Sequence, residues 1–184
     1  MELTADVVER LAEEYAATHP FATVEAEHLE ILPPMLEDGA YGWRDVEWIV
    51  QWYYRRDPGH DAAARRRREG AFGDNEYDEV HAAIDDAIAT EDTAAKLEAL
   101  THLSGVDVSV ATAFLAFLDP DRYLVMSERE WTTLEQCGEL ASPYPDRPSA
   151  TDYERYLETC RTVADRCDCD LVTLYRALWG VQTS

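Results

Sequence analysis

Lysine is almost absent from this sequence, and cations of either kind are scarce. Lysine and arginine together number 16, of which only Lys96 is a lysine, against 38 aspartates and glutamates, so the formal net charge is −22. Disorder is excluded, because hydrophobic residues make up 46% of the chain and recur with helical periodicity. At molar ionic strength the Debye length is roughly 3 Å, so repulsion between the carboxylates would be largely screened. We therefore expect a halophilic protein, with a generic acidic protein as the alternative.

Long hydrophobic runs and a basic leader are also missing. No stretch approaches the ~20 apolar residues of a membrane span, so we expect no membrane partner. The segment from Met1 to Tyr15 is acidic and amphipathic, unlike a signal peptide. The thiols follow no zinc spacing, which predicts no metal site and a cytoplasmic, reducing location. The four cysteines are Cys137, Cys160, Cys167 and Cys169.

No segment alternates apolar and polar residues as a strand does, so the fold class is all-α: one compact multi-helix domain over residues 1–184. About ten helices are expected, counting short ones. Pro33-Pro34 should stop or kink the second helix, and Ser127 and Thr151 each open a Ser/Thr-x-x-Glu capping box. Asn75 is a plausible cap for the helix that starts at Tyr77. The longer predicted helices are Thr4–Thr18, Val24–Glu30, Trp43–Arg56, Tyr77–Ala89, Ala94–His102, Val108–Leu118 and Leu171–Val181, with two more starting at Ser127 and Thr151.

An arginine-rich segment, residues 60–74, differs from the predicted helices because it offers little apolar surface. Arg65, Arg66, Arg67 and Arg68 follow one another in it, before two glycines. Such charge runs usually form solvated or mobile faces. In so acidic a chain the same cluster is also the best local candidate for contacting phosphate. Both interpretations stay open.

Two carboxylate–histidine pairs, Glu25-x-x-His28 and Asp78-x-x-His81, resemble the ligand pairs of di-iron helix bundles. The first stands among further glutamates on what reads as an acidic surface face, and the second uses aspartate. We interpret both as surface coincidences. The sequence contains no serine–histidine–aspartate order and no glycine-rich phosphate loop.

The most informative stretch is Leu103-Ser-Gly-Val-Asp107, which separates the Ala94–His102 helix from the apolar run Val108–Leu118. The run is apolar almost all round, which indicates a buried central helix. Pro120-Asp-Arg-Tyr and the capping box at Ser127 follow. This order resembles the core of the helix-hairpin-helix DNA glycosylase superfamily over roughly 30 residues, with the hairpin at about 94–118.

The resemblance implies that amides of the turn from Ser104 through Gly105 and Val106 to Asp107 hold a DNA phosphate, with a monovalent cation possible on the turn carbonyls. Glycine turns and helix N-termini do present N–H groups to anions. No other cofactor is implied. Asp107 replaces a glycine of the superfamily and fits better as the N-cap of the following helix.

The catalytic positions of the superfamily are altered. Its nucleophilic lysine aligns with Ser109 and its shared aspartate with Ser127, and serine supplies no negative charge to an oxocarbenium-like centre. Asp119 and Asp121 lie nearby and could compensate, although Asp-Pro-Asp is more simply a turn.

Three hypotheses follow. The first is a catalytically silent relative of the glycosylases that binds DNA or another partner; the second is an active base-excision glycosylase using Asp119 or Asp121. The third is an all-α structural or interaction protein in which the hairpin is only a tight turn. A pocket beside Ser127 lined by Trp43, Trp48 or Tyr123 would favour base binding, because flipped bases are held by stacking. The sequence leaves the oligomeric state open.

Overall fold

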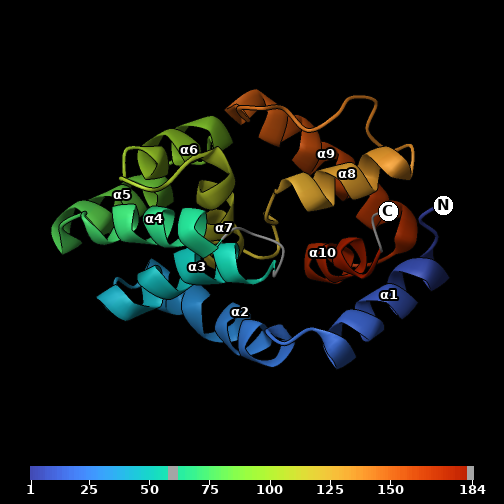
Figure 1. The fold of residues 1–184 in the computed structure, drawn as a ribbon, viewed down its shortest axis with the longest axis horizontal. Coiled ribbons are helices and arrows are strands. Elements are labelled where there is room, and N and C mark those ends of the chain that lie inside the picture. The colour runs from blue at the N-terminus through green and yellow to red at the C-terminus, as the bar shows by residue number, and fades with distance from the viewer. Residues whose placement is uncertain (58–61, 182–184) are drawn as a thin grey trace.

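The computed structural model describes residues 1–57 and 62–181, and this part of the chain forms ten α-helices and no strand (Figure 1). The all-α prediction and the expected number of helices are confirmed. The helices are α1 (Ala5–Thr18), α2 (Ala22–Glu37), α3 (Trp43–Arg55), α4 (Ala62–Gly73), α5 (Tyr77–Ala89), α6 (Thr93–Thr101), α7 (Val108–Leu118), α8 (Glu128–Gln136), α9 (Ala150–Cys167) and α10 (Leu171–Gly180). No helix of the described ranges is long and apolar enough to cross a membrane.

Helix α7 lies at the centre of the core, as its apolar run predicts. Nine of its 11 residues are buried, and it packs against α2, α3 and α6. Asp107 caps its first turn, since the carboxylate accepts a hydrogen bond of 3.0 Å from the amide of Val110. In Figure 1, α4–α6 lie on one side of α7 and α8–α10 on the other, with α1 packed along α10. The candidate site lies between these two groups.

Helix α2 continues through Pro33 and Pro34, so the prediction that it stops near Glu30 is wrong. The prolines remove the amide donors for the carbonyls of Leu29 and Glu30, and Glu30 lies on the exposed face, where water can satisfy its carbonyl. Leu32 and Leu36 are buried on the opposite face and hold the segment on the core. Burial on that face therefore keeps the helix intact.

Residues 62–73 of the arginine-rich segment form helix α4, which the charge run did not predict. Positions 60 and 61 lie outside the described residues. Phe72 is fully buried and packs on Trp43, and the Arg55 guanidinium makes hydrogen bonds of 2.9 and 3.0 Å to the Glu69 carboxylate. Contacts with α3 and the core thus compensate for the weak amphipathicity of this helix.

Two helix caps differ from their predicted positions. Helix α9 is capped by Ser149, whose hydroxyl accepts from the amide of Asp152, two residues before the expected cap Thr151. Helix α5 is preceded by Glu76, and Asn75, the expected cap, bonds to the α6–α7 turn instead. At both helices the start lies within two residues of the predicted position although the cap residue differs, so the sequence predicts where a helix starts better than which residue caps it.

Candidate binding cleft

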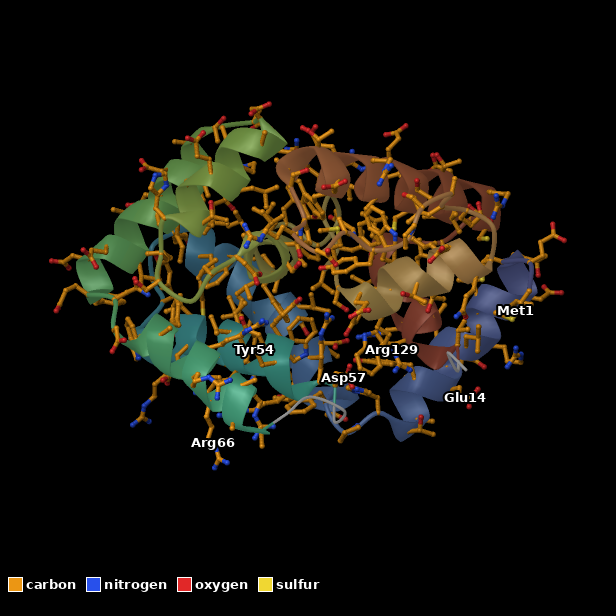
Figure 2. All side chains as sticks on the ribbon, turned by 45° about the horizontal axis from the view of Figure 1, so that its top comes forward. Met1, Glu14, Tyr54, Asp57, Arg66 and Arg129 are labelled. Carbon is orange, nitrogen blue, oxygen red and sulfur yellow. The ribbon has the colours of Figure 1, made fainter. Side chains whose placement is uncertain are left out.

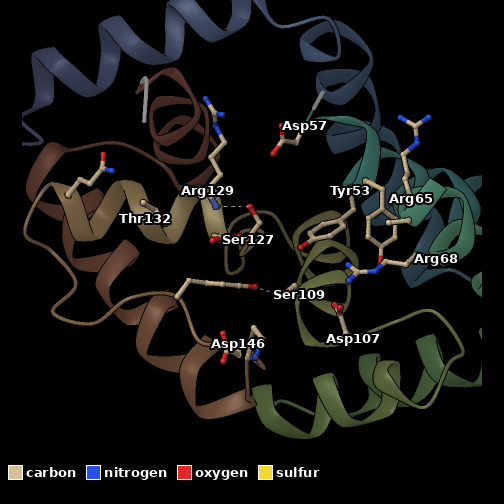
Figure 3. A pocket seen from close by; sticks show the side chains of 16 residues that line it. Tyr53, Asp57, Arg65, Arg68, Asp107, Ser109, Ser127, Arg129, Thr132 and Asp146 are labelled. Atoms are coloured by element: carbon tan, nitrogen blue, oxygen red, sulfur yellow. Dashed lines mark hydrogen bonds between the residues drawn. The ribbon is translucent and has the colours of Figure 1, made fainter. Parts of the chain in front are cut away.

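A cleft of about 710 Å³ opens between the α3–α4 pair and α8, with the N-terminus of α7 at its base (Figure 3). The loop that joins α8 to α9 forms its remaining wall. The side chains and backbone that line it belong to Tyr53, Tyr54, Asp57, Ala64, Arg65, Arg68, Asp107, Ser109, Ser127, Glu128, Arg129, Thr132, Gln136, Tyr144, Asp146 and Pro148.

Three positions singled out by the sequence meet in this cleft. Asp107 and Ser109 come from the start of α7, and Ser127 caps α8 from the opposite side. The two serines occupy the positions of the nucleophilic lysine and the shared aspartate in the resemblance. The described part of the chain therefore has a concave site beside Ser127.

The arginine run lines the cleft with only one face of α4. Arg65 and Arg68 line it, and the guanidinium carbon of Arg68 lies 5.7 Å from the centroid of the Tyr54 ring. Arg66 and Arg67 are exposed and do not line it, and Arg66 points away from the body of the protein (Figure 2). Spacing of three residues along a helix accounts for the first pair sharing a face.

Tyrosines form much of the apolar wall. Tyr53 and Tyr54 are buried on the α3 side, and Tyr144 faces them from the α8–α9 loop. The hydroxyls of Tyr144 and Ser109 are hydrogen-bonded at 2.7 Å. Burial raises the pKa of both Tyr54 and Tyr144 to about 12, so both phenols are neutral at pH 7. The cleft thus combines neutral aromatic surface with hydroxyl groups.

The remainder of the predicted phosphate-binding turn faces α4 rather than the cleft. Gly105 has a φ of +76°, and a Cβ built on it would lie 2.6 Å from the amide nitrogen of Phe72. The Ser104 amide donates to the Asn75 carboxamide at 2.8 Å, and Val106 is buried. A phosphate on the Ser104 amide would have to displace Asn75. The monovalent cation implied at this turn stays a prediction.

Asp119 and Asp121 do not line the cleft. Asp119 follows the last residue of α7, whose 11 residues span about 16 Å at ~1.5 Å per residue, whereas the cleft lies at the first turn. The Asp119 carboxylate accepts a hydrogen bond of 3.2 Å from the backbone amide of Arg122. The structure therefore does not bring these two carboxylates to the serine positions.

The aromatic residues proposed to line a base pocket also lie elsewhere. Trp43 stacks on Phe72, Trp48 packs on Phe117, and Tyr123 is buried in the core. None of the three lines the cleft, whose tyrosines take their place. Helical spacing predicts burial of Trp43, Trp48 and Tyr53 alike, but it does not show which buried ring borders a cavity.

Beneath the cleft lies a buried ion pair that sequence reasoning missed. Arg56, next after α3, and Glu130, in the first turn of α8, are 2% and 0% exposed at their side chains. The hydroxyl of Ser127 donates to Oε2 of Glu130, and Nε1 of Trp179 donates to Oε1 at 2.7 Å. The capping-box pattern did mark Glu130, but it predicts a glutamate bonded to backbone at the surface.

Glu25 is buried as well, so its assignment to an acidic surface face is wrong. Its carboxylate accepts a hydrogen bond of 2.7 Å from the Tyr15 hydroxyl and pairs with Arg176 at 3.4 Å. His28 stacks on Trp48 instead of facing Glu25. No group of three or more potential metal ligands occurs among residues 1–57 and 62–181, and the four cysteines are free thiols.

A second, smaller hollow of about 330 Å³ adjoins the cleft. Asp57 and Arg129 line both cavities, so the two are neighbours. Tyr15, His19 and Trp179 supply aromatic surface to the second hollow. A ligand longer than one ring could extend from one cavity into the other.

Comparison of the chain with family models, with curated proteins and with solved structures finds no match. The resemblance to helix-hairpin-helix glycosylases therefore rests on the residues quoted above.

Proposed function

We propose that this protein binds nucleic acid without cutting it, holding one unstacked base in the cleft. The observation that carries the proposal is the convergence of Asp107, Ser109 and Ser127 with Arg65 and Arg68 around one cavity. These residues come from three separate parts of the chain. The resemblance implies contact with a nucleotide at Asp107, Ser109 and Ser127, and the positive charge of Arg65 and Arg68 suits a phosphate.

The cavity suits a base in size and chemistry. Ligand sites commonly measure ≈ 300–1,000 Å³, and the cleft falls within that range. Extruded bases are held by stacking on aromatic side chains and by hydrogen bonds to their edges. Tyr53, Tyr54 and Tyr144 offer the aromatic surface, and Asp107 and Ser109 offer polar groups beside it.

The cleft is also less acidic than the chain as a whole, so it suits a phosphate-bearing ligand better than the rest of the surface does. Three arginines and four carboxylates line it, whereas the whole chain has 16 cations and 38 carboxylates. Arg65 and Arg68 are placed to contact phosphates that flank the bound base. Serine at positions 109 and 127 supplies neither an amine nucleophile nor a carboxylate, which is why we propose binding without base excision.

Fluorescence anisotropy with labelled single-stranded DNA, and with duplex carrying one unpaired base, tests the proposal across a KCl series. Two double variants of α4 form a matched pair: Arg65→Ala with Arg68→Ala, and Arg66→Ala with Arg67→Ala. Both remove two charges from one helix. We expect the first to flatten the slope of log K against log salt by about 1.4, at ~0.7 per phosphate contact on a single strand, and the second to change it little.

If the two double variants flatten the salt slope equally, the cleft is not the binding site. Absence of binding by the folded wild-type protein at every salt concentration would overturn the proposal as a whole. A flatter salt slope in Arg65→Ala/Arg68→Ala alone, with thermal unfolding unchanged, supports the proposal.

A further inference from the structure

Arg129 occupies the boundary between the cleft and the second hollow. It lies in the first turn of α8, and its guanidinium carbon is 4.2 Å from the centroid of the Trp179 ring. One terminal nitrogen donates to the Trp179 carbonyl oxygen at 3.0 Å. Stacking and this hydrogen bond hold the guanidinium in place, so its remaining donors have a defined direction.

Within residues 1–57 and 62–181, those remaining donors have no acidic partner. No carboxylate of the described residues lies within 4.0 Å of the Arg129 guanidinium, and its Nε is buried without a hydrogen-bond acceptor. Arg55 and Arg56 on the neighbouring wall are both paired with glutamates. In a chain with 38 carboxylates, a half-buried arginine beside two cavities that keeps free donors is placed for an anion from outside.

His19, which lines the second hollow together with Arg129, does not contribute a positive charge to it. His19 donates from Nε2 to the Arg56 carbonyl oxygen at 3.2 Å, while its Nδ1 accepts from the Phe21 amide at 3.3 Å. This pattern fits the neutral imidazole. Burial lowers the pKa of His19, and the charges of Arg56 and Arg129 act in the same direction. Asp57 faces Arg129 across the opening, so an anion would sit on the Trp179 side.

We propose that Arg129 forms an anion subsite that binds the phosphate adjoining the base in the cleft. The shared chemistry is that of a phosphate oxygen, whether it belongs to a phosphodiester or to free phosphate. As a phosphodiester site it rests on the proposed nucleic-acid function; as a phosphate site it stands by itself.

The direct test is an NMR titration of the whole chain that follows the arginine Nε–Hε signals, with Arg129 assigned from its loss in Arg129→Lys. Sodium phosphate is compared with sodium chloride at equal ionic strength. We expect a saturable shift of the Arg129 signal with phosphate only. A shift that is linear in both salts, or no shift, would overturn the subsite.

DNA binding provides the second arm. Arg129→Gln should weaken the binding of single-stranded DNA by about tenfold, since it removes charge-assisted hydrogen bonds to a phosphate. Arg44→Gln is the matched control, because Arg44 is exposed on α3 and lines neither cavity. Arg129→Lys keeps the charge and should recover part of the loss, which separates charge from lost packing on Trp179.

The two proposals fail differently. Saturable phosphate binding together with no DNA binding would retain the subsite and overturn the nucleic-acid function. DNA binding that is equally tight in Arg129→Gln and Arg44→Gln, with no phosphate shift, would overturn the subsite and retain the function.

Discussion

Arg56 Nη1 lies 3.0 Å from Glu130 Oε1, and this ion pair joins the end of α3 to the start of α8 inside the protein. Four aromatic rings lie within 6 Å of the Arg56 guanidinium carbon, those of Trp52, Tyr53, Tyr175 and Trp179. The pair therefore ties together the two walls of the cleft, with both side chains almost completely buried. Buried pairs contribute little net stability, but breaking one is costly.

Glu130→Gln should destabilise the protein by about 3–5 kcal/mol, because it leaves the Arg56 charge buried and unpaired. Adding Arg56→Met should recover most of that loss, since the double variant leaves no unpaired charge buried between α3 and α8. Urea denaturation measures both free energies of unfolding. Glu139→Gln serves as the control, because its partner Arg166 is exposed and surface pairs contribute about 0–1 kcal/mol. Additive effects of the two core substitutions would contradict the account.

Gly105→Ala should destabilise the protein by about 3 kcal/mol, through a positive φ and a clash with the α4 backbone. Gly70→Ala within α4 is the matched control, because an added Cβ there meets nothing within 4 Å. That control should be stabilising by about 0.5–1 kcal/mol, as expected for glycine replaced by alanine in a helix. Similar stabilities for the two variants would show that the turn tolerates a side chain.

Acidification should destabilise the native state through His19. Its folded-state pKa is lowered by burial, so the unfolded chain, with a histidine pKa ≈ 6.5, binds the proton first as the pH falls. The stability contributed by neutral His19 is thus present above about pH 6.5 and lost below it. His19→Phe keeps a ring on Tyr15 but cannot titrate. Unfolding free energies of both proteins between pH 5 and 8 should converge toward the acidic end; parallel curves would refute the assignment.

Salt should stabilise the protein. The single lysine is buried, with Nζ donating to the Ala87 carbonyl oxygen at 2.7 Å, so it does not offset the acidic surface. Screening of carboxylate repulsion should raise the free energy of unfolding steadily between about 0.1 and 1 M KCl, where the Debye length falls from ≈ 10 to ≈ 3 Å. Thermal unfolding in KCl measures this. A midpoint that stays constant or falls with KCl would argue against adaptation to salt.

No base should be released from damaged or mismatched duplexes. Asp119 and Asp121 lie away from the cleft, and Ser127 donates its hydroxyl to Glu130. Incubation with a broad lesion panel at low and high salt, followed by alkaline cleavage at abasic sites, measures excision. Abasic product that disappears in Asp107→Asn would instead identify a cleft carboxylate as catalytic and remove the non-catalytic part of the proposal.

Much of the fold was predictable because most helices carry one apolar face and a recognisable cap. The buried α7 and its Asp107 cap follow directly from the apolar run and the preceding aspartate. Helix α4 did not follow, since its single buried side chain is Phe72 and its support comes from contacts distant in sequence. Continuation of α2 through Pro33 likewise depends on tertiary burial, which outweighs local propensity.

The site was predictable only in part. Resemblance singled out Ser109, Ser127 and Asp107, which do meet in space. It could not show that Arg56 and Glu130 pair beneath them, because a buried charge looks like a surface charge until its partner is known. The sequence also could not show that Arg65 and Arg68, but not Arg66 and Arg67, line the cleft. That distinction depends on the register of α4, a helix that the periodicity did not predict.

The cleft is assembled from four parts of the chain: residues 53–57 with 64–68, 107–109, 127–136 and 144–148. A ligand seated in it would act as a cross-link between them and could bind only the fully assembled protein. At a concentration a hundred times its Kd, such a ligand would add ≈ 2.7 kcal/mol to the free energy of unfolding. Thermal-shift screening of nucleotides and other small anions is therefore a direct route to whatever occupies the cleft.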